Sequence, residues 1–224
     1  MPTYPTDFSR WRLQQLEQVF GLKNVKKMPE LSSWTDNPAK VSEKDQQNLI
    51  DLLEFSDSRL MYWNEAALKW KFLSQVIFAA HLDTEFYATY PEIKLSARLQ
   101  TVDNQILKLS GVADLILAKG RLEPELPYFC LHEYKKVKGF DSDPLAQTLA
   151  AMLVAQELNQ KVSSIHPIYG CYTIGLSWFF LALSEKNYAI SKPYTFADKE
   201  NLIEIVGILS NLNEITKKIL NQEN

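Results

Sequence analysis

The sequence GVADLIL at residues 111–117 is followed by PYFCLHEYKK at residues 127–136, and both runs have the composition of buried β-strands. Charged residues interrupt the apolar pattern: Asp114 in the first run, and Glu133 with Lys135 in the second. Side chains alternate between the two faces of a strand, so Glu133 and Lys135 point to the same side. Neighbouring strands lie about 4.8 Å apart, so Asp114 and Glu133 converge if these strands pair.

The segments on either side predict a mixed sheet flanked by helices. Strand patterns cover residues 93–101, 105–118, 127–136, 168–174, 177–183 and 187–190, with a turn near Asp103. Helical apolar spacing covers residues 8–27, 43–55, 58–82, 144–159 and 196–220, and residues 28–42 read as a loop. Asp143 before Pro144 is typical of a helix start. Three consecutive strands, a crossover helix and further strands predict an α/β fold with a mixed central sheet.

This pattern predicts three regions in the chain. Residues 1–57 are expected to form an N-terminal helical arm that packs outside the core and contributes no core strand. Residues 58–192 are expected to form the core, and residues 193–224 a C-terminal helix packed on it. An arm of this kind should be removable without unfolding the core.

Composition excludes several classes of protein. The chain has 224 residues, 46% of them hydrophobic, and a formal net charge of −3, so it can bury a core but lacks a strongly basic character. Its seven glycines form neither a GxGxxG nor a P-loop motif. Two cysteines without a CxxC exclude zinc fingers, zinc ribbons and thioredoxin-like sites. The sequence has no signal peptide or membrane span, which predicts a cytoplasmic protein.

The two carboxylates predict a site for a hard divalent cation. Oxygen atoms of Asp114, of Glu133 and of the Tyr134 backbone carbonyl form the kind of ligand set that suits Mg²⁺ or Mn²⁺. Lys135 would stand beside a water molecule held there and beside a phosphate under attack.

This layout resembles the PD-(D/E)xK, or restriction-endonuclease-like, nuclease superfamily over about residues 60–190. Asp114 matches the acidic residue of the second core strand, and Glu133 with Lys135 matches the (D/E)xK of the third. Glu65 fits the glutamate that the family often has on its first core helix. The resemblance implies a restriction-endonuclease-like fold and metal-dependent hydrolysis of DNA, with all four residues catalytic and Glu65 a further candidate metal ligand.

A second match follows the crossover helix. The pattern G-x-x-T-x-G-x-x-W-x-F resembles the strand–turn–strand of the nuclease-like domain in type I restriction R subunits, and consists of Gly170, Thr173, Gly175, Trp178 and Phe180. Gln147, on the preceding helix, is expected to point inward and support the site. The resemblance is incomplete, because Ala113 replaces the family's proline and Ala151 interrupts a QxxxY motif.

Each candidate residue also has a plainer interpretation. Glu65 could form an i,i+4 surface pair with Lys69. Lys136 and Lys138 could bind phosphate or lie in a solvated turn. Packing is the expected role of His132 and Cys130, and of the tryptophans that could instead stack on bases, namely Trp63, Trp70 and Trp178.

Two alternatives to a nuclease stay open. One is a catalytically inactive module of the same fold that binds nucleic acid or a protein partner. The other is a helical scaffold in which Asp114 and Glu133 do not converge. A homodimer is compatible with each of these interpretations.

Overall fold

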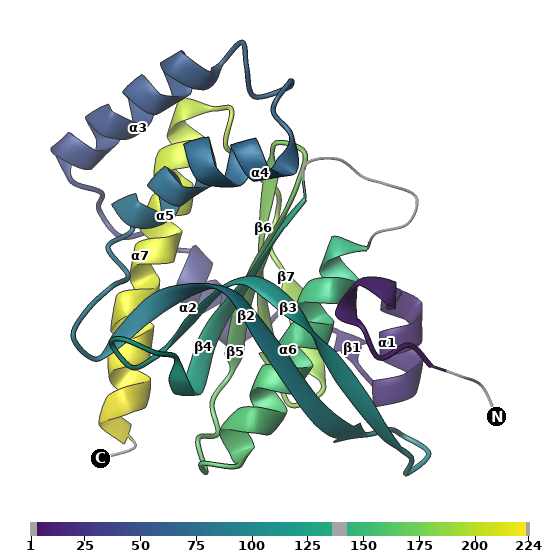
Figure 1. Cartoon of the computed structure of the whole chain (residues 1–224). Coiled ribbons are helices and arrows are strands. Elements are labelled where there is room, and N and C mark those ends of the chain that lie inside the picture. The colour runs from purple at the N-terminus through teal and green to yellow at the C-terminus, as the bar shows by residue number, and fades with distance from the viewer. Residues whose placement is uncertain (1–3, 136–142, 223–224) are drawn as a thin grey trace.

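The computed structural model of the chain describes residues 4–135 and 143–222, and these residues form one mixed sheet with helices on both faces (Figure 1). The sheet contains β1 (Lys23–Asn24), β2 (Tyr87–Gln100), β3 (Ile106–Lys119), β4 (Glu125–Lys135), β5 (Ile168–Ile174), β6 (Ser177–Ser184), β7 (Asn187–Ile190) and β8 (Tyr194–Thr195). The helices are η1 (Phe8–Arg10), α1 (Leu13–Phe20), α2 (Pro29–Thr35), α3 (Glu43–Ser56), α4 (Glu65–Leu68), the π-helical turn η2 (Lys69–Leu73), α5 (Ser74–Ala79), α6 (Pro144–Gln160) and α7 (Lys199–Gln222).

The strand order confirms the α/β class with a mixed sheet. The strands follow one another as β1-β7-β6-β5-β4-β3-β2, and β8 pairs with β6. Strands β4 and β5 are parallel, which requires a crossover, and α6 supplies it. The hairpins β2–β3 and β5–β6 are antiparallel, as is the β3–β4 pair. The expected cap is also present, since Asp143 accepts a hydrogen bond from the backbone N–H of Ala146 at 3.0 Å.

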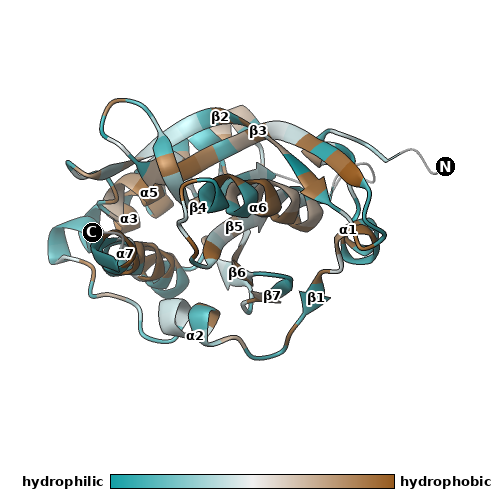
Figure 2. Cartoon of the chain, turned by 90° about the horizontal axis from the view of Figure 1, so that it is seen from below, coloured by the Kyte–Doolittle hydropathy of each residue, from teal (hydrophilic) through white to brown (hydrophobic). Residues whose placement is uncertain are grey.

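The sheet separates two hydrophobic cores (Figure 2). Helices α1 and α6 cover one face, where Trp11 and Leu131 are buried. Helices α2, α3, α5 and α7 cover the other face, where Trp34 and Phe129 are buried. From Cys130 to Lys135 the side chains of β4 therefore point alternately to the two faces of the sheet, which places two kinds of site on its two faces. Among the described residues, no helix is long and apolar enough to cross a membrane.

Local structure differs from the sequence-based expectation at several boundaries. The helix expected over residues 8–27 ends at Phe20, because Gly21 takes a left-handed conformation with φ of 71°. Helix α2 forms within the expected loop and starts at Pro29, whose fixed φ suits a first helical position. The helix expected from residue 58 starts at Glu65, where the Asn64 side chain caps it. Strand β8 was not expected.

The N-terminal segment differs from the expected helical arm, because it contributes one short edge strand and buried side chains to the fold. Strand β1 pairs with β7 in parallel and extends the sheet by one short edge strand. Trp34 is completely buried, and its indole N–H donates a hydrogen bond to the backbone carbonyl of Ile208 at 2.8 Å. Its ring contacts Tyr169 and Phe180 edge to face. The segment is thus part of the core, and its removal would expose a large apolar surface.

We expect Trp34→Ala to lower the free energy of unfolding by about 3–5 kcal/mol, because it leaves a cavity in the core and removes the hydrogen bond to Ile208. Trp70→Ala is the matched control: Trp70 is 81% exposed, so its loss should change stability by less than about 0.5 kcal/mol. Urea denaturation followed by circular dichroism measures both. Equal stability of the two variants would show that residues 29–35 do not contribute to the core.

Candidate functional site

The candidate site lies where β3 loses its pairing with β4 and where its pairing with β2 is interrupted at one position. The β3–β4 register ends at the pair Leu115 and His132, just before Asp114. On the other side, Glu92 interrupts the β2–β3 ladder with a left-handed φ of 53°, a conformation that is uncommon for residues other than glycine. The carboxylate of Asp114 replaces the missing pairing, because its Oδ2 accepts a hydrogen bond from the backbone N–H of Tyr134 at 2.8 Å.

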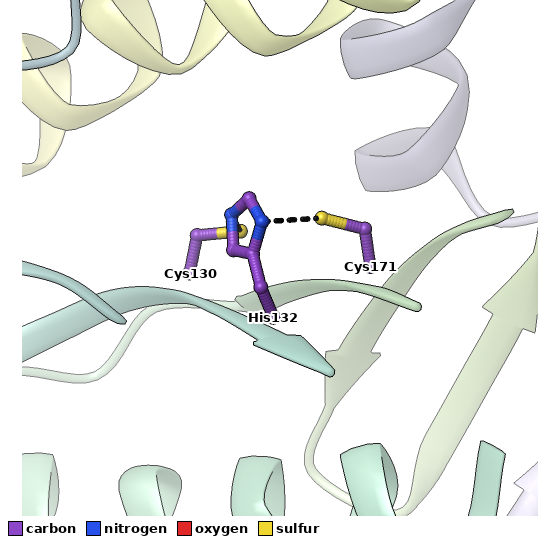
Figure 3. A group of neighbouring side chains, drawn as sticks. All are labelled: Cys130, His132 and Cys171. Carbon is purple, nitrogen blue, oxygen red and sulfur yellow. Dashed lines mark hydrogen bonds between the residues drawn. The ribbon is translucent and has the colours of Figure 1, made fainter. Parts of the chain in front are cut away.

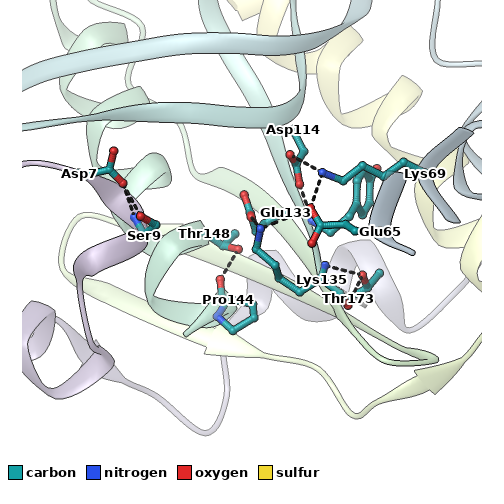
Figure 4. A network of polar contacts seen from close by, with 11 residues as sticks. Asp7, Ser9, Glu65, Lys69, Asp114, Glu133, Lys135, Pro144, Thr148 and Thr173 are labelled. Atoms are coloured by element: carbon teal, nitrogen blue, oxygen red, sulfur yellow. Dashed lines mark hydrogen bonds and ion pairs between the residues drawn. The ribbon is translucent and has the colours of Figure 1, made fainter. Parts of the chain in front are cut away.

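Four predicted residues meet at this point in one network of ion pairs (Figure 4). The Nζ of Lys135 lies 3.1 Å from Oε1 of Glu133 and 3.5 Å from Oε1 of Glu65. Asp114 joins the network through Lys69. Asp114, Glu133, Lys135 and Glu65 therefore belong to one cluster, and the sharing of one divalent ion by Asp114 and Glu133 stays a prediction.

Lys69 is a member of the network that the sequence indicated only as the i,i+4 partner of Glu65. Its expected i,i+4 pair with Glu65 is present, at 2.9 Å from Nζ to Oε1. The same Nζ lies 2.8 Å from Oδ1 of Asp114, so one ammonium group bridges two carboxylates. Lys69 reaches Asp114 because α4 and η2 pass across the end of the sheet at this point (Figure 1). The ammonium group of Lys69 thus lies between Glu65 and Asp114.

Glu133 is the most perturbed group in the cluster. Its side chain is only 4% exposed, and its buried Oε1 has the ion pair with Lys135 but no hydrogen bond of good geometry. Burial, and after it the negative charge of Asp114, raises the pKa of Glu133 to about 8. A carboxyl group in this environment gains stability from an additional positive charge.

The two lysines are held in their charged form. Burial lowers the pKa of Lys135, but Glu133 and the other carboxylates outweigh this effect, and the net shift is upward. The pKa of Lys69 is also raised, since Asp114 and Glu65 outweigh its burial. Both side chains therefore carry a positive charge over the physiological range of pH.

Three residues of the second sequence pattern have clear structural roles in the segment that follows the crossover helix. The hydroxyl of Thr173 accepts a hydrogen bond from the backbone N–H of Lys135 at 3.2 Å and so ties β5 to β4 beside the site. Gly175, with φ of 61°, forms the turn between β5 and β6. Gly170 leaves room for α6, because a Cβ atom there would lie 2.6 Å from the Sδ of Met152. Thr173 thus positions Lys135 through its backbone, and the pattern contributes structural residues rather than a reacting group.

The remaining candidates are less closely connected to the network. Gln147 is buried on α6 as expected, and its Oε1 has no hydrogen-bond partner in the described part of the chain. No hydrogen bond between described residues joins Gln147 to the three acids and two lysines of the network. The backbone of Tyr134 lies at the site, and the role of its carbonyl as a ligand stays a prediction. Lys136 and Lys138 fall outside the described residues.

A cavity of about 570 Å³ opens beside the ion-pair network. Asp114, Lys69 and Tyr134 contribute to its wall, and most of the remaining lining is apolar. Trp70 and Phe78, which also line it, are 81% and 78% exposed. Of the three tryptophans considered from the sequence, Trp178 is a core residue, whereas Trp70 presents an aromatic surface to solvent next to Asp114.

The comparisons with known proteins do not assign a family. No protein-family model matches the chain, and no curated protein matches it. The function of the site therefore has to be inferred from its residues and their geometry.

The raised pKa of Glu133 predicts a pH-dependent stability in the absence of divalent metal. Between about pH 4.5 and about pH 8 the folded chain keeps a proton that the unfolded chain releases, so stability falls as pH rises across this window. The slope should approach about 1.4 kcal/mol per pH unit. Urea denaturation in the presence of a chelator, repeated across the window, measures it.

Glu133→Gln should remove this slope, while Glu54→Gln, at an exposed position on α3, should keep it. A wild-type protein whose stability is constant across the window would contradict the assignment of a buried, protonated Glu133.

Proposed function

We propose that this chain is a metal-dependent nuclease of the PD-(D/E)xK class that hydrolyses phosphodiester bonds in DNA. The observation that carries the proposal is the meeting of Asp114, Glu133 and Lys135 at the point where β3 and β4 separate. The restriction-endonuclease-like fold that the sequence resembles is supported by the element order: a helix, a three-stranded antiparallel unit, the crossover helix α6, and then β5 beside β4.

The residues fit a divalent cation in two ways. Glu133 is a buried carboxyl group whose Oε1 lacks a hydrogen bond and whose ionised form needs a nearby positive charge. Glu65 and Asp114 already share one cation, the ammonium group of Lys69. Asp114 and Glu133 would hold Mg²⁺ or Mn²⁺, together with the carbonyl of Tyr134, and Glu65 is a further candidate ligand. Such an ion would supply activation of water and neutralisation of charge on the phosphate.

Lys135 would act on the phosphate itself. It is charged, only 23% exposed, and fixed from two sides, since Glu133 pairs with its ammonium group and Thr173 binds its backbone. A positioned positive charge in a partly dry site stabilises the negative charge that develops on a phosphate during attack by water. Glu65, which contacts both lysines, would keep them in place before substrate binds.

The cavity supports a nucleic acid as substrate. Its apolar wall and the exposed ring of Trp70 lie next to Asp114, where a base near the scissile phosphate could stack. Lys136 and Lys138 directly follow Lys135 in the sequence and are proposed to contact the phosphate backbone.

A catalytically inactive module of the same fold is the second candidate. It is favoured by Lys69, whose ammonium group bridges Asp114 and Glu65 and can substitute permanently for a metal ion. The two candidates differ in whether a divalent ion displaces this lysine.

We expect the protein to nick supercoiled plasmid DNA in the presence of Mg²⁺ or Mn²⁺. Lys135→Ala should lower the rate by at least about 100-fold while leaving metal binding largely intact, because the lysine is not a ligand. Asp114→Ala should lose metal binding and nicking together. Calorimetric titration with Mn²⁺ and a plasmid assay, run on the same preparations, separate these effects.

Lys186→Ala is the matched control, because Lys186 is exposed in the β6–β7 turn away from the network, and it should retain full activity. Metal binding without nicking by the wild type would favour the inactive module. Equal nicking by all variants would show that the activity is not that of this site.

Replacement of Lys69 by methionine should strengthen metal binding. The substitution keeps the length of the side chain and removes the cation that competes for Asp114, so Mn²⁺ affinity should rise by about three- to ten-fold. Lys71→Met changes an exposed lysine in the same π-helical turn and should leave affinity unchanged. Calorimetry measures both, and a weaker affinity after Lys69→Met would show that Lys69 supports the site instead of competing for it.

A further inference from the structure

A second group of candidate ligands lies on the opposite face of β4. Cys130 and His132 are two residues apart on this strand, so they share a face, and the register pairs His132 with Cys171 on β5. The three side chains point toward one another (Figure 3). One ligand atom from each residue can be chosen so that all three lie within 4.8 Å of one another. This group is formed across strands, so the spacing of the cysteines along the sequence did not indicate it.

The group is enclosed by the core. Both cysteines are fully buried and His132 is 2% exposed. The Sγ of Cys171 lies 3.2 Å from Nδ1 of the imidazole, and the Sγ of Cys130 lies 3.5 Å from Nε2. The hydroxyl of Tyr134 is 2.7 Å from Nδ1. The expectation that Cys130 and His132 are packing residues accounts for their burial but not for the meeting of three soft ligands at one point.

We propose that Cys130, His132 and Cys171 bind a thiophilic closed-shell metal ion, for which Zn²⁺ has the matching charge. Two thiolates and one imidazole form a ligand set that selects Zn²⁺ or Cu⁺ over Mg²⁺. Two thiolates neutralise the charge of Zn²⁺, so the complex can be buried without a net charge. Both thiols release their protons when the ion binds, which balances the charge.

The neighbouring residues suit such a site. The hydroxyl of Tyr134 contacts the imidazole as second-layer groups do when they fix the orientation of a metal-binding histidine. Trp178 packs edge to face on both His132 and Tyr134 and excludes water from this side. The ion would join β4 to β5 behind Glu133, a structural role that does not depend on the proposed nuclease activity.

The test begins with the full-length wild-type protein, purified without chelator after growth with added zinc. Elemental analysis by mass spectrometry should find about one zinc ion per chain. Replacement by Co²⁺ should give near-ultraviolet thiolate-to-cobalt absorption together with strong visible bands, which are characteristic of tetrahedral sulfur coordination. Cys171→Ser and Cys130→Ser should lose these bands, and Asp114→Ala, at the other site, should keep them.

Recovery of copper in place of zinc would also support a thiophilic site and would identify Cu⁺ as its ion. The proposal is wrong if the wild type carries no zinc or copper and gives no thiolate absorption with Co²⁺, or if Cys130 and Cys171 are joined in a disulfide. The wild-type measurements require no substitution, so they decide the outcome even where a cysteine variant does not fold.

Discussion

The burial of the Glu133 carboxyl group is the constraint around which the site is organised. A carboxylate removed from water is costly, and here a second acid, Asp114, adds to the cost. Two features offset part of it: the ion pair with Lys135 and the second ammonium group of Lys69 on the neighbouring acids. The cost that remains raises the pKa of Glu133 to about 8. A core does not need such an arrangement for stability, since an apolar side chain in place of Glu133 would avoid the cost altogether.

Strand β4 carries residues of both proposed sites on its two faces. Leu131, Glu133 and Lys135 alternate with Cys130, His132 and Tyr134, so the carboxylate network and the sulfur–imidazole group lie on opposite faces of one strand. Hard oxygen ligands gather at the sheet end that opens to a cavity, whereas soft ligands gather in the closed core. This division follows the preference of each ligand type, because hard cations keep water in their shell and thiophilic ions do not require it.

The sequence predicted those parts of the molecule that depend on local periodicity. The long strands, helix α6 with its Asp143 cap and the convergence of Asp114 with Glu133 follow from the alternation of apolar and polar residues. Prediction from the sequence failed where the structure depends on contacts between residues far apart in the chain. Strand β1 forms because β7 offers an edge, Trp34 is buried because α7 lies beside it, and Lys69 reaches Asp114 only when helix and sheet are assembled. The meeting of Cys171 with His132 depends on the parallel register of β4 and β5, which local sequence does not specify.

The strength of the ion pairs of Lys69 helps to choose between the two candidate functions, a metal-dependent nuclease and an inactive module. Its side chain is 27% exposed and that of Glu65 is 38% exposed, so this ion pair is screened by water and is worth roughly 0–1 kcal/mol, whereas Asp114 is 16% exposed and its pair with Lys69 is less screened. A divalent ion therefore has to overcome only about 1–2 kcal/mol, about a factor of ten in affinity, to take the place of this ammonium group between the carboxylates. The positive charge of Lys69 reduces the repulsion between the two acids before metal binds. Its flexible side chain can then move away from them when an ion takes its place. On these grounds the ion pairs of Lys69 are better explained as a replaceable counter-charge than as a permanent block, which favours the metal-dependent nuclease over the inactive module.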